Sequence, residues 1–379
     1  TQDLHIDGQM AGSIQFAQST QWKELEIATV KLKTGAHNLS LVKNWGYISL
    51  DFLSIKYVGN TSSPFNIDAN LVTPQPSAQV VKVYNFLKEN FGKKVISGVI
   101  SDSTRNTNEA RWVYEKTGKW PALVGYDFID HTWLKQNWIK YDGPFIQGKR
   151  HWENNGLVTL MWHWRDPLTK SGEFYTDKTS FDVSRISNPN SNEYKAMIDD
   201  IDTIATYLKQ FQKAGIPVIW RPLHEAAGGW FWWGAKGPEP CKTLWRLMFD
   251  RLVNHHKINN LIWVWTTDVA ATAADWYPGD QYVDVLGMDI YPGENQHGSQ
   301  YISFNKVKEI FGGKKLITLS ECGSVPDPAL MLEYNDMWSW FMVWSGDYTR
   351  SDLHNGANWW QKFFTYDFVM TRDKMPDLK

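Results

Sequence analysis

The spacing of apolar residues changes character part-way along the chain, near residue 78. Before this point, short alternating apolar runs separated by glycines lie at 4–6, 13–16, 26–30, 39–42 and 48–57. Alternation with a period of two, broken by turn residues at hairpin spacing, is typical of antiparallel β-strands. The pattern therefore predicts a small antiparallel β segment over residues 1–60, followed by a loop-rich linker over residues 61–77.

From residue 78 onward, apolar strands alternate with helical stretches. The predicted strands lie at 94–100, 121–127, 157–163, 216–223, 260–266, 283–289, 315–320 and 340–345. The predicted helices lie at 78–91, 107–118, 144–155, 192–214, 240–257, 300–312, 328–337 and 355–367. Eight strand–helix units over about 300 residues fit an α/β fold, the (β/α)8 or TIM barrel. The sequence therefore predicts one barrel domain over residues 78–379.

Composition and charge exclude several classes of function. Charged residues make up 21% of the 379 residues and the net charge is −2, so we expect no nucleic-acid partner. No apolar run reaches the roughly 18 residues that a membrane helix needs. The two cysteines, Cys241 and Cys322, have no metal-binding spacing, and two buried thiols are favoured over a single disulfide bridge.

Tryptophan is unusually abundant, with 22 residues in a chain whose aromatic fraction is 15%. The tryptophans cluster at 162 and 164, at 230, 232 and 233, at 263 and 265, at 338, 340 and 344, and at 359 and 360. Many of them must belong to the core, because aromatic rings bury a large area. Several clusters fall at predicted strand ends, however. Because the apolar face of a pyranose stacks well on an indole, carbohydrate is the ligand class that these clusters favour.

Two glutamates close predicted buried strands and lie among these tryptophans. Glu225 ends the fourth predicted strand and Glu321 ends the seventh. Catalytic groups of a (β/α)8 barrel sit at the carboxyl ends of its strands, so both side chains are expected to project into the same open mouth. Hydrolysis of a glycosidic bond with retention needs a proton donor and a nucleophilic carboxylate about 5–5.5 Å apart. A salt-bridged pair of structural carboxylates is the alternative.

The surroundings of the two glutamates suggest which role each one takes. Glu225 precedes a long aromatic loop, residues 228–234, beside which a leaving sugar could rest, so it suits the acid/base. Glu321 follows a β-branched strand and precedes Cys322 and Gly323, a tighter setting that suits a fixed nucleophile. A nearby carboxylate raises the pKa of an acid by repulsion and keeps it protonated near neutral pH.

Three motifs give the barrel a specific family resemblance. They are Trp220-Arg221-Pro222-Leu223-His224-Glu225 with Gly229-Trp230-Phe231-Trp232-Trp233-Gly234, then Asp289-Ile290-Tyr291-Pro292, and Ser320-Glu321-Cys322-Gly323. Over about residues 70–379 the chain resembles glycoside hydrolase family 26, whose retaining enzymes are dominated by endo-β-1,4-mannanases. The resemblance implies Glu225 as acid/base and Glu321 as nucleophile, with no cofactor and no metal.

The same resemblance implies further contacts with the substrate. His163 matches the family's sugar-binding histidine and His224 would hydrogen-bond near the reacting sugar, while Tyr291 would hydrogen-bond the nucleophile. Trp230 would stack on a sugar beside the acid/base, and Trp344 would form the floor of the cleaved sugar's site. Core packing is the alternative for each of these side chains.

A few neighbouring residues are weaker candidates. Trp162, next to His163, is expected to contact substrate, and Asp127 and Asp130 are candidate contacts with a distal sugar. Trp232 and Trp233 either line the cleft or prop up the aromatic loop.

The N-terminal segment has a separate resemblance. The runs Leu4-His5-Ile6-Asp7-Gly8, residues 30–41 and residues 49–55 look like the second half of a family 35-type carbohydrate-binding module, which is a β-sandwich. Half a sandwich leaves an open edge and an uncovered apolar face. Either the parent protein extends upstream, or these strands pack on the barrel.

The main hypothesis is a retaining endo-β-1,4-mannanase acting on mannan, glucomannan or galactomannan. The same catalytic residues would also serve a mixed-linkage β-glucanase or a β-1,3-xylanase, and a non-catalytic carbohydrate-binding protein is the alternative of another class. The expected partner is a β-mannan polysaccharide. Because such a polymer cannot enter cells, we expect secretion or display at the cell surface, as a monomer or as part of a larger multimodular chain.

Overall fold

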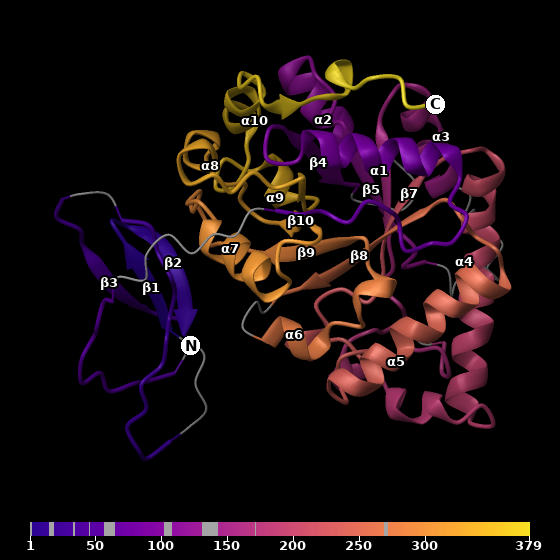
Figure 1. Ribbon diagram of the computed structural model, residues 1–379, viewed down its shortest axis with the longest axis horizontal. Helices are drawn as coiled ribbons and strands as arrows, with labels where there is room; N and C mark the ends of the chain where they lie inside the picture. The colour runs from indigo at the N-terminus through magenta and orange to yellow at the C-terminus, as the bar shows by residue number, and fades with distance from the viewer. Residues whose placement is uncertain are drawn as a thin grey trace.

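The structure is a computed structural model in which a closed barrel stands beside a small β-sheet (Figure 1). It describes residues 2–14, 19–32, 35–44, 46–56, 65–101, 108–130, 143–170, 172–268 and 272–379. Parts of the expected strands at 13–16 and 48–57, and of the linker at 61–77, therefore lie outside the described residues.

Eight parallel strands form the barrel. They are β4 (Val95–Ile100), β5 (Leu123–Asp127), β6 (Leu157–Met161), β7 (Val218–Arg221), β8 (Leu261–Thr267), β9 (Val285–Ile290), β10 (Leu316–Cys322) and β11 (Trp340–Val343). Each strand pairs with the next in sequence, and β11 closes the barrel by pairing with β4, Trp340 opposite Ile96. The strands are buried along almost their whole length, as expected when helices cover the outside. The predicted TIM barrel is confirmed.

Helices between the strands form the outer layer. They are α1 (Ala78–Asn90), α2 (Asn108–Thr117), α3 (Gly143–Glu153), α4 (Asn192–Lys213), α5 (Pro238–Phe249), α6 (Ala273–Trp276), α7 (Tyr301–Ile310), α8 (Pro328–Tyr334), α9 (Asp347–Arg350) and α10 (Ala357–Phe364). A π-helical stretch, Asp250–His255, continues α5, so the two together span the helix expected at 240–257. The short helices α6 and α9 were not expected, because four residues are too few for a periodic pattern.

Helix α4 shows how local sequence sets these elements. The Ser191 side chain accepts a hydrogen bond from the Tyr194 N–H (3.0 Å) and caps the first turn. The apolar residues of α4 share one buried face. Gly215 follows the helix with φ 68°, a left-handed conformation that glycine adopts at little cost and that ends the helix.

The N-terminal segment forms a three-stranded antiparallel sheet in the order β2-β1-β3. Its strands are β1 (Gln2–Ile6), β2 (Gln9–Ile14) and β3 (Leu39–Lys43). Asp7 and Gly8 join β1 to β2 with φ of 52° and 81°, the pair of positive angles that a type I′ hairpin needs. The sheet lies beside α7, where the Lys31 N–H donates to the Tyr301 hydroxyl (2.8 Å) (Figure 1).

Two of the expected N-terminal strands do not form. Residues 26–30, and the described part of 48–57, carry no strand pairing. In the second run Leu50, Phe52 and Ile55 are all more than half exposed. Strands of a sandwich gain stability by burying one face against a second sheet. Among the residues that the structure describes, no such sheet covers these positions, so the alternating pattern has no partner.

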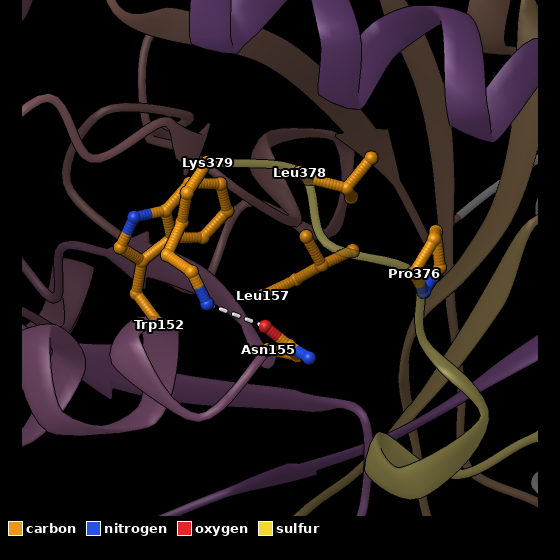
Figure 2. Close-up of a pocket in the computed structure, with 6 residues that line it drawn as sticks. All are labelled: Trp152, Asn155, Leu157, Pro376, Leu378 and Lys379. Atoms are coloured by element: carbon orange, nitrogen blue, oxygen red, sulfur yellow. Dashed lines mark hydrogen bonds between the residues drawn. The ribbon is translucent and has the colours of Figure 1, made fainter.

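The C-terminal tail packs at the end of the barrel opposite the strand carboxyl ends. The short strand β12 (Val369–Met370) pairs with β4, and Leu378 and Lys379 pack near Trp152 of α3 and Leu157 at the start of β6 (Figure 2). The Lys379 ammonium donates to the Asn155 side chain (2.5 Å). The tail therefore contacts the barrel near the amino-terminal ends of β4 and β6, away from the carboxyl ends of the strands.

Both cysteines are buried free thiols, as expected. Among the described residues, no helix is long and apolar enough to cross a membrane.

Candidate active site

Three carboxylates meet at the carboxyl ends of three barrel strands. Glu321 lies within β10, Asp289 lies within β9, and Glu225 follows β7. One oxygen of each carboxylate lies within 4.8 Å of the others. The two glutamates predicted to act together therefore do converge, at a separation suited to attack and protonation on one glycosidic bond.

Glu321 is held by two donors on its own side of the cleft. Its side chain is buried, with the residue 4% exposed, and it accepts hydrogen bonds from the Arg221 guanidinium and from the Tyr291 hydroxyl. Charge-assisted hydrogen bonds of this kind stabilise the ionised carboxylate and restrict its position. Tyr291 was predicted to hydrogen-bond Glu321, and its hydroxyl does so.

Arg221 and Asp289 complete this charged cluster, and sequence reasoning gave neither of them a role. Arg221 donates through Nη1 to Asp289 (2.7 Å), and Ser320 donates to the other oxygen of Asp289 (2.7 Å). Burial works against the charged guanidinium, but Asp289 and Glu321 outweigh it and raise the pKa of Arg221. A charged residue inside an apolar strand was the signal that could have identified both, since such a residue needs a buried partner.

The three carboxylates are close enough together to hold a cation. The Arg221 guanidinium already takes one oxygen of Asp289 and one of Glu321. Its positive charge offsets the repulsion among the carboxylates, a role that a metal would otherwise have to fill.

Glu225 stands on a turn rather than on a strand. β7 ends at Arg221, four residues earlier than Glu225, which corrects the expectation that Glu225 itself closes the strand. Leu223 and Glu225 both have left-handed backbones, with φ of 51° and 53°. At a residue other than glycine, a left-handed conformation costs about 1–3 kcal/mol. It persists only where the surrounding structure enforces it.

One buried tryptophan is bonded to this turn, and a second anchors the loop that follows the turn to the end of β6. The Trp233 indole donates to the carbonyl of His224 (2.8 Å) and the Trp232 indole donates to the carbonyl of Trp164 (2.5 Å). Both rings are fully buried, so they prop up the loop instead of lining the cleft. Gly234 is equally tied to the turn, because a Cβ there would lie 2.0 Å from the carbonyl oxygen of Ala226.

The environment of Glu225 suits a proton donor. Burial and the negative charge of Glu321 raise the pKa of Glu225 to about 7, partly opposed by Arg221. The Trp230 indole donates to one oxygen of Glu225 (2.9 Å) and lowers that pKa slightly. Asp268, just beyond β8, adds a further negative charge that raises it. Glu225 is therefore protonated in a large fraction of molecules near neutral pH.

The predicted histidines form a hydrogen-bonded chain. Asp127 binds Nδ1 of His163 (2.5 Å) and accepts from its backbone N–H (2.9 Å), and Nε2 of His163 lies 3.1 Å from Nε2 of His224. Burial opposes a charged His163, but Asp127 prevails and raises the pKa of His163. Burial and the positive charge of Arg221 hold the pKa of His224 well below its usual range. Asp127, expected at a distal sugar, instead orients His163.

The predicted aromatic contacts divide into two groups. Trp230 is 42% exposed and Trp344, just after β11, is half-buried with its ring 5.9 Å from that of His163. Both remain available to a ligand. Trp162 does not: it is 1% exposed and stacks on Trp164 at 3.9 Å. Its packing beneath the strand end replaces the substrate contact expected for it.

Comparisons with known families agree with this geometry. Residues 72–374 match the family described as "Glycosyl hydrolase family 26". Residues 1–58 match "Carbohydrate binding module (family 35)".

Similar proteins match over most of the chain. A mannan endo-1,4-beta-mannosidase of Thermothelomyces thermophilus is 36% identical over 98% of this chain and 76% of its own length. One similar solved structure is the crystal structure of a beta-mannanase from a symbiotic protist of the termite Reticulitermes speratus, complexed with gluco-manno-oligosaccharide. Its sequence is 39% identical to this chain, and the TM-score is 0.78. The match covers 83% of this chain and 99% of that one. The Podospora anserina GH26-CBM35 beta-(1,4)-mannanase is 32% identical with a TM-score of 0.78, over 100% of this chain and 84% of that one.

Proposed function

Because the chain belongs to glycosyl hydrolase family 26, we propose that it hydrolyses β-1,4-mannan, glucomannan or galactomannan at internal linkages, with retention of configuration. The observation that carries the proposal is the meeting of Glu225 and Glu321 within 4.8 Å at the barrel mouth, each in the environment that its role needs. Relatives over nearly the whole chain are described as mannan endo-1,4-beta-mannosidases.

The first chemical step forms a covalent glycosyl-enzyme. A carboxylate oxygen of Glu321 attacks the anomeric carbon while Glu225 gives its proton to the departing glycosidic oxygen, so the glycosidic bond breaks as the ester bond forms. Arg221 and Tyr291 hold Glu321 in place for this attack. Positioning of the nucleophile removes part of the entropic barrier to the step.

The second step uses the same residues in reversed roles. Once Glu321 is esterified its negative charge is gone, and one of the causes that raise the pKa of Glu225 is removed. Glu225, now ionised, takes a proton from water, and the resulting nucleophile attacks the anomeric carbon and releases Glu321. Two inversions at one carbon give net retention.

Which β-glycan the enzyme prefers depends on the contacts between the cleft and the sugar, and not on the catalytic pair. The same catalytic pair would serve a mixed-linkage β-glucanase or a β-1,3-xylanase. We favour mannan because relatives at 32–36% identity over 98% of the chain are described as mannan endo-1,4-beta-mannosidases. A purely carbohydrate-binding role is disfavoured, since the chain retains both glutamates together with Arg221 and Tyr291.

The direct test measures reducing sugar released from locust-bean gum, lichenan and β-1,3-xylan at equal enzyme concentration. The proposal expects release from the mannan above the other two, and NMR of the early products should show the β-anomer first. Activity on lichenan or xylan alone would reject the mannan assignment, and an early α-anomer would reject retention. Mannohexaose products of mixed lengths would indicate internal cleavage, whereas a single product length would indicate action from an end.

We also propose that the protein acts outside the cell, since its polymeric substrate is found there. The N-terminal sheet, which matches a carbohydrate-binding module over residues 1–58, would then keep the barrel near the same polysaccharide.

A further inference from the structure

Asn355, between α9 and α10, has a buried side-chain amide whose hydrogen bonds reach the segment directly after Glu321. Its Nδ2 donates to the carbonyl of Gly323 (2.6 Å), and its Oδ1 accepts from the Val325 N–H (2.9 Å). A second donation from Nδ2 goes to the carbonyl of Tyr348 in α9 (2.8 Å). The whole residue is fully buried. One side chain therefore ties the segment that follows β10 to the segment that follows β11.

The Tyr348 residue that this amide anchors packs its ring against Tyr291. The two ring centres lie 5.1 Å apart in a T-shaped arrangement, and the Tyr291 hydroxyl donates to Glu321. Both rings also lie close to the backbone after β10, because a Cβ on Gly323 would be 3.1 Å from the Tyr348 ring and 3.2 Å from the Tyr291 ring. Edge-to-face packing of this kind favours one mutual orientation of the rings. A chain of contacts thus leads from Asn355 to the proposed nucleophile.

An amide is the side chain that these contacts require. A primary amide has two N–H donors and a carbonyl acceptor, and Asn355 uses its nitrogen for two carbonyls and its oxygen for one N–H. Removing it would take a partner from three backbone groups at once. A second link between the same two segments does not depend on this amide, since the Ser324 hydroxyl lies 2.9 Å from Nδ1 of His354. The role of Asn355 can therefore be tested by substitution.

We propose that Asn355 is a positioning residue for Glu321 and acts through Tyr348 and Tyr291. Its amide holds the Tyr348 ring against Tyr291, and this packing keeps the Tyr291 hydroxyl directed at the carboxylate of Glu321. A reacting group that is misplaced by about 1 Å can cost about a hundredfold in rate, so an indirect contact of this kind affects turnover. This inference rests on the proposed role of Glu321 as nucleophile and adds to it a residue that sets the geometry of the attack.

The test is a double-mutant cycle between Asn355→Ala and Tyr291→Phe, with kcat/KM on mannohexaose as the readout. Asn355→Ala alone should lower kcat/KM about tenfold, because the Tyr291 hydroxyl is no longer held in place. In the Tyr291→Phe background the hydroxyl is already missing, so the same substitution should cause less than a twofold further loss. A further loss of twofold or more would show that Asn355 acts independently of Tyr291, which overturns the proposal. So would a change of less than twofold in the single variant Asn355→Ala.

Asn260→Ala is the matched control for lost stability. Asn260 is 1% exposed and donates through Nδ2 to the carbonyl of Ile216 (2.7 Å), just before β8 at the amino-terminal end of the barrel. Its substitution should lower the melting temperature, as Asn355→Ala does, and change kcat/KM less than twofold. An equal loss of activity in the control would mean that instability explains the effect of Asn355→Ala, and the proposal would fail. If Asn355→Ala does not fold, Asn355→Ser, whose hydroxyl still serves one buried group, takes its place in the same cycle.

The outcome stays distinct from that of the proposed function. An activated 2-deoxy-2-fluoro-mannoside should esterify Glu321 in the wild type, and mass spectrometry of peptides locates the ester. If the ester forms and the two losses multiply, the positioning role alone is rejected. If the wild type cleaves lichenan and not mannan, the mannan assignment fails, and the same cycle on mixed-linkage gluco-oligosaccharides still decides the role of Asn355. An ester on another residue would reject both the nucleophile and the positioning role.

Discussion

The two sides of the cleft hold their glutamates by different means. Glu321 belongs to β10 and is fixed within the barrel sheet, where Arg221 and Tyr291 donate to its carboxylate. Glu225 stands outside the sheet on a left-handed turn, where the buried Trp233 indole donates to the carbonyl of His224. One side is stabilised by charge and strand pairing, the other by aromatic packing around a strained backbone.

This difference matches the two chemical tasks proposed for the glutamates. A nucleophile needs a fixed, ionised oxygen, and donors inside a barrel strand provide it. An acid/base must exchange a proton twice in each cycle, so its pKa has to lie near the working pH. Placing Glu225 on a turn exposes it to the charge of Glu321 while keeping it out of reach of the direct ion pair that Arg221 makes with Glu321.

The largest expected effect comes from removing the strand-held carboxylate. Glu321→Ala leaves no atom to form the covalent intermediate, so kcat on mannan should fall by about 10⁴-fold or more. Binding of mannohexaose, measured by calorimetry, should remain within a few-fold of wild type. Residual turnover within a hundredfold of wild type would show that another group is the nucleophile.

The turn-held glutamate should show a smaller effect that depends on the leaving group. Glu225→Gln keeps the size of the side chain but removes the transferable proton, and general acid–base catalysis contributes about 10²–10⁴-fold. We expect a loss in this range on mannan. An aryl mannobioside whose phenolate leaves without protonation should lose less in its first step, visible as a burst of phenol. Equal losses on both substrates would contradict the acid role.

The aromatic packing behind the turn can be tested without touching either carboxylate. In Gly234→Ala the new methyl would lie 2.0 Å from the carbonyl oxygen of Ala226, so the backbone that carries Glu225 must shift. We expect a loss of about 1–3 kcal/mol in the free energy of unfolding and a fall in kcat of about tenfold or more. Gly298→Ala is the matched control, because its methyl would meet nothing closer than 3.6 Å. A neutral Gly234→Ala would show that the turn adapts freely.

The smallest expected effect is a shift in the pH profile. Because protonated Glu225 is the active form and its pKa is about 7, kcat/KM should fall as pH rises through about 7. The Trp230 indole stabilises the ionised carboxylate, so Trp230→Phe should raise this pKa and move the alkaline limb to higher pH by less than one unit. The midpoint of the limb, measured on an aryl mannobioside, is the readout. A shift to lower pH would contradict the hydrogen bond from Trp230.

Much of the barrel could be predicted from sequence because its elements are regular. Strands and helices repeat a local apolar period, and a residue near a strand's carboxyl end reaches the barrel mouth whatever the packing of the rest. This argument was sufficient to select Glu225 and Glu321 as a converging pair. The N-terminal runs at 26–30 and 48–57 have the same local pattern but no covering sheet among the described residues, so the period alone predicted strands that do not form.

Local spacing and composition thus determined the barrel and placed the two glutamates near the carboxyl ends of their strands, because each of these features depends on residues close together in the chain. Tertiary packing decided the rest of the site. The left-handed turn of Glu225, the pairing of Arg221 with Asp289 and Glu321, and the burial of Trp162 all depend on groups from different strands. So does the bridge between Tyr175 and Phe231. Such contacts depend on which loops the closed barrel brings together. The periodicity of apolar residues in the sequence does not predict which loops become neighbours.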